Sequence, residues 1–253
     1  MKSTITKLST EASINGVQYI EDYSFGCGKT APVFEVSTQH GLNQLLGNAK
    51  FVNREYGEVL YRGQCHLYET VMPSLIRGYK QVCSQMKRLR ALIELIKNDT
   101  LLRKDLKAQN NDICDAIIEG VLQHYGVPTR YIDLVDNHWV ALWMGQYEMQ
   151  KTKSIEEYAH YKKRAILIEN IVNGDYLADK KDDLYQYILL LAIPSALGSE
   201  GVTEANGFCR VDLRQALPSI FLRPHAQHGI VVRRKGADRT KQISMILLLK
   251  WLE

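Results

Sequence analysis

The stretch from Leu122 to Gly145, LQHYGVPTRYIDLVDNHWVALWMG, constrains the fold most, because it joins a helix end, a break, a strand and a second helix with little spacer. Gly126 suits the end of the first helix, since glycine adopts positive φ at no steric cost. Pro128 cannot continue a helix and favours extended backbone before it. Residues 129–133 are polar at the ends and apolar within, which predicts a short strand.

Both helices around this strand are expected to be buried. In the first, Ile117 and His124 share one face at helical spacing, so His124 should point inward. Asn137 is a good N-cap for the second helix, which is apolar around most of its surface. Buried polar groups are costly unless they are paired or used. Four such groups are brought together here: His124, Thr129, Arg130 and Asp133.

Composition sets the broad class. The 253 residues are 45% hydrophobic and 24% charged, as in a globular protein that forms one large domain. The net charge of +4 permits an anionic ligand or nucleic acid without requiring either. Five cysteines, an odd number without a CxxC pair, indicate free thiols in a reducing compartment. We find no signal-peptide core and no bilayer-spanning apolar run, so we expect a cytoplasmic protein without a membrane partner.

The pattern of segments predicts a single α+β domain over residues 1–253, with a central mixed β-sheet and an added helical layer. Strands are expected near Tyr61, Tyr131, Ile168, Val231 and Leu247. Residues 79–123, rich in lysine and arginine, are predicted to form the helical insertion in a motif core of about 58–232. This layer presents a solvated face or, alternatively, a docking surface. Residues 182–193 are apolar and fit either a helix or a strand, and a helix that runs into a strand is the favoured interpretation.

Three distant segments share polar residues at a strand end beside glycine or proline. These are residues 61–64 (YRGQ), 124–133 and 223–229. Glycine lets a ligand approach the backbone closely, and arginine binds phosphate or carboxylate with two hydrogen bonds. The pattern favours an anionic, planar ligand. Alternatively, Arg62 forms a structural ion pair with Asp133 or Glu69, and His124 is a satisfied core histidine.

Two other patterns give weaker evidence for a ligand site. His225 and His228 have the spacing of metal ligands on a helix, but Pro224 and Gly229 argue against a helix, and we expect no metal. Residues 28–30 (GKT) end like a phosphate-binding loop, but no glycine stands at the required spacing before them, so a surface turn is expected.

The motifs in this order resemble the FRG domain family of bacteria and phages, which is named for an aromatic-Arg-Gly motif. The resemblance covers about residues 61–232. It rests on four segments: YRGQ at 61–64, PSL at 73–75, HYGVPTRYID at 124–133 with Ala141-Leu142 in the next helix, and Arg223 with Gln227-His228-Gly229. The motif order is also similar to that of ADP-ribosyltransferases, which use NAD. An ADP-ribosyltransferase-like fold is therefore implied.

This resemblance implies a set of roles. Arg62 would contact the NAD phosphates or ribose, and the 129–133 strand would shape the nicotinamide pocket. The implied catalytic residues are Arg62, His124, Asp133 and Gln227, and the implied NAD-binding residues are Tyr61, Gly63, Gln64, Thr129, Arg130 and Arg223. The sequence departs from the pattern at two positions. Gln227 supplies an amide where a glutamate is usual, and Val135 stands where a hydroxyl residue is common.

The leading hypothesis is an NAD-dependent ADP-ribosyltransferase or NAD glycohydrolase with a toxin or phage-defence role. The acceptor would be a protein or nucleic acid, and no metal is required. One alternative is a non-catalytic module that binds a nucleotide or nucleic acid through the same arginines. Another is a hydrolase that uses His124 and Asp133 as its acid-base pair.

Overall fold

The computed structural model describes residues 13–25, 29–68, 70–77, 82–106, 111–151, 159–163, 185–194, 201–205, 207–235 and 244–252. The chain divides into two compact units. Unit 1 consists of Met1–Thr70, Asn137–Ile193 and Ser244–Glu253, and unit 2 of Val71–Asp136 and Pro194–Ile243. Tyr61 belongs to unit 1 and Val231 to unit 2. That residues 1–253 form one domain stays a prediction.

Unit 1 contains a mixed sheet in the order β1-β2-β11-β7-β3. These strands are β1 (Val17–Phe25), β2 (Lys29–Val36), β3 (Gly57–Gln64), β7 (Tyr185–Pro194) and β11 (Ser244–Leu252). β2 and β11 pair in parallel, whereas β1 with β2 and β11 with β7 are antiparallel. Of the strands expected for one central mixed sheet, those near Tyr61 and Leu247 belong to the mixed sheet of this unit. The strand expected near Leu247 is β11, and the one near Ile168 lies outside the described residues.

The prediction of a helix at the start of residues 182–193 is wrong where the structure describes it. β7 is a strand from Tyr185, and each of its residues from Gln186 to Pro194 is buried. A continuous apolar run is typical of a strand covered on both faces, and its periodicity alone does not separate it from a buried helix.

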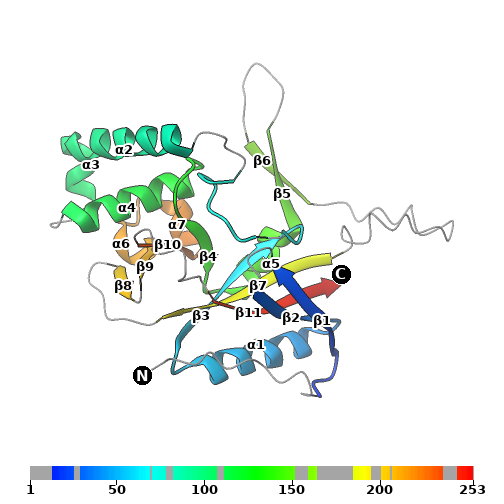
Figure 1. Cartoon of the computed structure of the whole chain (residues 1–253). Helices are drawn as coiled ribbons and strands as arrows, with labels where there is room; N and C mark the ends of the chain where they lie inside the picture. The colour runs from blue at the N-terminus through cyan, green and yellow to red at the C-terminus, as the bar shows by residue number, and fades with distance from the viewer. Residues whose placement is uncertain are drawn as a thin grey trace. The chain divides into compact units, whose positions relative to one another are not determined.

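Two helices pack on the strands of unit 1 (Figure 1). α1 (Gln39–Asn53) begins at Thr38, whose hydroxyl accepts a hydrogen bond from Gly41 N at 3.1 Å. α5 (His138–Gln146) packs against β3. Its N-cap is Asn137, which accepts from Trp139 N at 2.9 Å, so the predicted cap is confirmed. β5 (Tyr147–Lys151) and β6 (Ala159–Lys163) form a separate antiparallel pair.

Unit 2 has its own antiparallel strands, in the order β4-β10-β9-β8. They are β4 (Ile132–Val135), β10 (Gly229–Arg234), β9 (Phe208–Asp212) and β8 (Val202–Ala205). Gly229 pairs with Val135, and Ile230 with Asp212. The register therefore brings the end of β4, the start of β10 and the end of β9 to one edge of unit 2.

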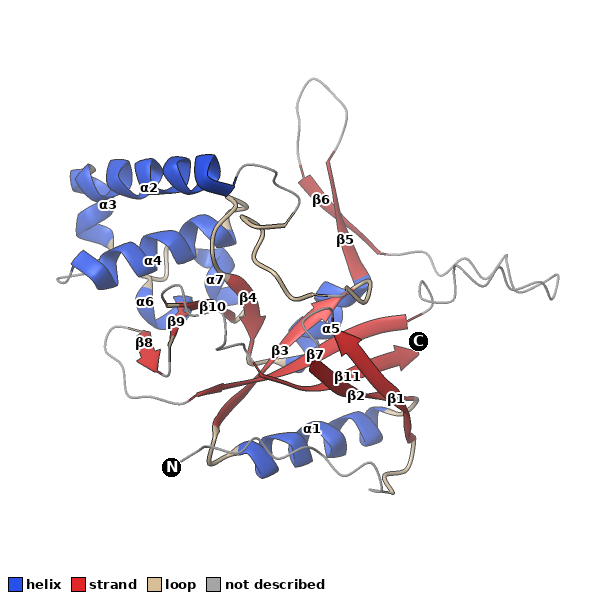
Figure 2. Cartoon of the chain, viewed as in Figure 1, coloured by secondary structure: helices blue, strands red, loops and turns tan. Residues whose placement is uncertain are grey.

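Helices cover one face of these strands. α2 (Val82–Asn98), α3 (Thr100–Asp105) and α4 (Asn111–His124) follow one another, with α2 beside α4 (Figure 2). A Cβ on Gly120 of α4 would lie 3.1 Å from Val231, so this helix packs closely on β10. α6 (Leu213–Ala216) and α7 (Leu222–Ala226) are short. The core of unit 2 includes Leu75, Leu89, Ile93, Ile117, Ile118, Tyr131, Val211, Leu213 and Val231.

The α+β class is thus confirmed, and the region predicted to be helical holds α2, α3 and α4. None of the described helices is long and apolar enough to cross a membrane.

Candidate functional site

The break between α4 and β4 forms as the sequence predicts. Gly126 has φ +90°, which favours glycine, and the next residue, Val127, donates its N–H to Leu122 O at 2.9 Å. This closes the last turn of α4. The chain then leads through residues 127–131 into β4, so the polar residues of this segment lie beside the end of α4.

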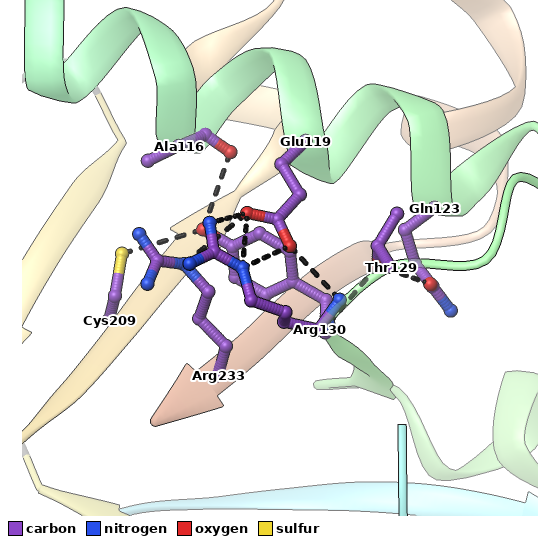
Figure 3. Close-up of polar contacts among 8 residues, drawn as sticks. Ala116, Glu119, Gln123, Thr129, Arg130, Cys209 and Arg233 are labelled. Carbon is purple, nitrogen blue, oxygen red and sulfur yellow. Dashed lines mark hydrogen bonds and ion pairs between the residues drawn. The ribbon is translucent and has the colours of Figure 1, made fainter. Parts of the chain in front are cut away.

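Arg130 is engaged with Glu119 of α4 (Figure 3). Its backbone N–H and its Nε each donate to Glu119 Oε1 at 2.9 Å, and its Nη2 contacts Oε2. The Glu119 side chain is 0% exposed. A buried carboxylate is costly without a partner, so the Arg130 guanidinium balances a charge inside unit 2.

Thr129 ties three segments together. Its hydroxyl donates to Gln123 Oε1 at 2.6 Å and accepts from Tyr131 N at 3.1 Å. Gln123 Nε2 in turn donates to Asp133 Oδ2 at 2.7 Å. Ser74 Oγ accepts from Thr129 N at 3.3 Å and donates to Gln123 Oε1 at 3.4 Å. The PSL and PTRYID motifs therefore meet at Gln123, a residue to which the sequence analysis gave no role.

Tyr131 anchors the same segment in the core. Its hydroxyl donates to Ala116 O at 3.3 Å and lies 3.5 Å from Cys209 Sγ. Burial raises the pKa of Tyr131 well above its usual value. Burial also raises the pKa of the Cys209 thiol, which makes it a poor nucleophile.

His124, at the end of α4, points inward as predicted and is buried. A Cβ on Gly229 would lie 3.0 Å from His124 Cε1, so this glycine leaves room for the imidazole. Among the described residues, His124 Nε2 is buried without a hydrogen-bond partner. Burial lowers the pKa of His124, and the charge of Asp133 partly opposes this. The imidazole is neutral near pH 7.

Four residues predicted for the site lie near one another in unit 2. Asp133 and Arg223 both act electrostatically on His124, and Gln227 lies within hydrogen-bonding reach of it. Arg223 Nε donates to Gln227 Oε1 at 3.3 Å. The geometry therefore brings groups from α4, β4 and the α7 segment to one buried imidazole.

A charged cluster beside this group was missed by the sequence analysis. Arg214 Nε donates to Asp212 Oδ1 at 3.1 Å, and its Nη2 lies 2.8 Å from both Asp212 Oδ2 and Asp136 Oδ2. His228 Nδ1 lies 2.9 Å from Asp136 Oδ1. The hydrogen bond to Asp212 raises the pKa of Arg214. The sequence placed His228 in a motif but gave no sign of its distant partners.

The YRGQ motif lies in β3 of unit 1. Arg62 Nε donates to Gln64 Oε1 at 3.0 Å, and Gln64 Nε2 donates to His66 O at 3.1 Å. Tyr61 is buried, with its ring 6.1 Å from that of His138 and the Lys50 ammonium 5.2 Å from its centre.

The backbone that approaches Gly63 is that of α5. A Cβ on Gly63 would lie 1.7 Å from Ala141 O and 2.9 Å from Gly145 N. Only a residue without a side chain fits there, so the glycine of YRGQ has a packing role.

The predicted residues thus fall into two sets. Tyr61, Arg62, Gly63 and Gln64 belong to unit 1, and His124, Thr129, Arg130, Asp133, Arg223 and Gln227 to unit 2. That Arg62 lines one site with His124, Asp133 and Gln227 stays a prediction. Among the described residues, no group of three or more His, Cys, Asp or Glu side chains could hold a metal ion.

Fold and site together define an α+β protein with a polar group of residues around a buried histidine. Residues 57–154 match the family model of the FRG domain. The predicted resemblance to the FRG domain is therefore confirmed over residues 57–154, and its extension to the motif at 223–229 stays a prediction. No curated protein and no solved structure gave a significant match.

Proposed function

We propose that this protein binds NAD and cleaves the bond between nicotinamide and ribose, as an ADP-ribosyltransferase or NAD glycohydrolase with a toxin or phage-defence role. An ADP-ribosyltransferase-like fold is part of the proposal. The observation that carries it is the gathering of Asp133, Arg223 and Gln227 around His124, whose Nε2 has no partner within the described part of the chain. A buried polar atom of this kind is available for a ligand.

The chemistry of these groups suits NAD. Arg223 is exposed and offers a planar donor fork for the pyrophosphate. The Gln227 amide can hydrogen-bond a ribose hydroxyl. Because the pKa of His124 is lowered by burial, its neutral ring can donate to or accept from the nicotinamide carboxamide.

Asp133 supplies the negative charge that the reaction needs. When the C1′–N bond breaks, the nicotinamide nitrogen keeps the electron pair, and positive charge develops on the ribosyl group. A nearby carboxylate stabilises this charge. Gln123 holds Asp133 Oδ2 at 2.7 Å and thereby fixes the carboxylate. An oxygen of water, or of a protein or nucleic-acid acceptor, then bonds to C1′ and loses its proton.

The proposal is tested by incubating the full chain with NAD and measuring free nicotinamide by chromatography. Wild type should release nicotinamide, and His124→Gln should lower the rate by about 100-fold. His40→Gln, at an exposed position of α1, is the matched control and should keep the wild-type rate. A wild type that NAD stabilises against heat but that releases no nicotinamide would instead be a binding module.

A hydrolase is the second candidate, because the charge of Asp133 acts on a buried histidine. In that case His124 and Asp133 would act as base and orienting carboxylate on an ester or phosphodiester. Wild type would then leave NAD intact and cleave a chromogenic ester or phosphodiester. His124→Gln and Asp133→Asn would both abolish this cleavage.

A further inference from the structure

His228 is placed by the strands of unit 2 beside a carboxylate that is distant in sequence. It precedes the first residue of β10, and Asp136 follows the last residue of β4. Because Gly229 pairs with Val135, the two side chains meet, with His228 Nδ1 2.9 Å from Asp136 Oδ1. A carboxylate on one imidazole nitrogen fixes the tautomer and leaves the other nitrogen as a base.

Arg214 holds Asp136 in place. The guanidinium bridges Asp212 and Asp136, and its Nη1 lies 3.0 Å from His228 Nδ1. Nδ1 cannot accept from Arg214 and donate to Asp136 at the same time. With two aspartates and one arginine, the cluster has one net negative charge while His228 is neutral. The Asp136 carboxylate attracts an Nδ1–H, so donation from His228 to Asp136 is the favoured arrangement.

The backbone supports the same interpretation. His228 has φ +52°, the one positive φ at a non-glycine among the described residues. Such a conformation costs energy and is found at functional sites when the surroundings hold it. Here the ring is fixed by Asp136, and its side chain stays 38% exposed. The exposed ring is accessible to a reactant.

We infer that Asp136 and His228 form the acid-base dyad that activates the acceptor in the reaction, an inference that rests on the proposed function. His228 takes the proton from the oxygen of water or an acceptor hydroxyl as that oxygen bonds to C1′. The electron pair of the broken C1′–N bond leaves with nicotinamide. Within the described part of the chain, the charged groups that contact His228 are Asp136 from the end of β4 and Arg214 from α6, with Asp212 bound to Arg214.

His228→Asn is the decisive variant. Asparagine tolerates positive φ and can donate to Asp136, but it cannot accept a proton at neutral pH. The variant should fold like wild type and lose about 100-fold in kcat for nicotinamide release, with KM within about threefold. The pH profile of kcat should change in the variant, because the general base is absent. A residue with a merely structural role would leave the pH profile unchanged.

Asp136→Asn and His225→Asn complete the test. Asp136→Asn should lower kcat, because the amide does not hold the imidazole in the tautomer that the carboxylate favours. His225→Asn is the control in the same segment, since His225 Nε2 contacts Leu217 O, and it should keep the wild-type profile.

The ring tautomer of His228 can be measured without an activity assay. Long-range ¹H–¹⁵N spectra of wild type should show neutral His228 protonated at Nδ1. Protonation at Nε2, with Nδ1 accepting from Arg214, would overturn the dyad even if NAD is cleaved. An unchanged kcat and an unchanged pH profile in His228→Asn would also overturn the dyad. A wild type that releases no nicotinamide refutes the proposed function and the dyad's role in it together.

Discussion

Arg130 and Glu119 form an ion pair in which the carboxylate is 0% exposed and the arginine 36% exposed. The arginine belongs to the PTRYID motif and the glutamate to α4, so the pair fastens the motif to the helical layer of unit 2. Arg233 adds a second cation, with its Nε 3.7 Å from Glu119 Oε2. A motif arginine that was expected to bind NAD therefore has a clear packing role.

Removing this arginine should destabilise the protein. Arg130→Ala leaves the buried Glu119 carboxylate with Arg233 alone, whose Nε lies 3.7 Å away. We expect the free energy of unfolding to fall by about 3 kcal/mol, which is the low end for a broken buried ion pair because Arg233 remains. Urea unfolding measures the loss. Arg88→Ala, on the exposed face of α2, is the control and should change stability by less than about 0.5 kcal/mol. If Arg130→Ala is as stable as wild type and loses the melting shift with NAD, the arginine binds ligand instead.

Gly63 should tolerate no side chain. In Gly63→Ala the new Cβ would meet the Ala141 carbonyl at 1.7 Å, and relief requires moving α5 away from β3. We expect a loss of about 3 kcal/mol or more in the free energy of unfolding. Gly47→Ala is the matched control, because a Cβ there meets nothing within 4 Å in α1, and it should stabilise by about 0.5–1 kcal/mol. Equal effects of the two substitutions would contradict the close approach of α5.

Arg62 can be tested for ligand binding separately from stability. Lysine offers a point charge in place of a planar fork, so Arg62→Lys should fold but show a smaller melting shift with NAD than wild type. Arg62→Ala should abolish the shift. The readout is the melting temperature of each variant with and without NAD. A strong loss of stability in Arg62→Ala, with no NAD effect on wild type, would assign this arginine to the architecture.

The buried His124 should make stability depend on pH. Its folded pKa lies below the ordinary value of 6.5, so between the two pKa values the unfolded state binds more protons. Stability should therefore fall as pH drops through about 6.5, and this loss should end below the folded pKa. His138, whose pKa burial also lowers, contributes with the same sign.

The measurement is urea unfolding of wild type and His124→Gln between about pH 8 and about pH 5. The variant should lose less stability over this range than wild type. His40→Gln, at an exposed position, should keep the full loss. A variant that loses as much as wild type would show that His124 does not carry the effect.

Local features were predictable from the sequence because they depend on near neighbours. Gly126 ends α4 as expected, since few other residues adopt its φ of +90° without strain. Asn137 caps α5 through a hydrogen bond two residues away. His124 faces the core because helical spacing places it on the same side as Ile117. The FRG motifs were recognisable for a similar reason, as each is a short run with fixed spacing.

The partners of polar residues were decided by the tertiary structure. Sequence reasoning treated Thr129 and Arg130 as ligand-binding groups, but packing of α4 on the strands brings Gln123 and Glu119 to them. It also left Asp136, Arg214 and His228 without roles. Their contacts depend on the register of β4 with β10, which joins residues 92 positions apart.

The sequence by itself determined the break at Gly126, the cap of α5, the inward face of α4 and the family that the motifs resemble, because backbone preferences and periodicity are local. Only the tertiary structure decided which inward polar groups form hydrogen bonds with one another and which are left to bind a ligand. A hydrogen bond is short and directional, so its existence depends on strand register and helix packing that no spacing along the chain encodes.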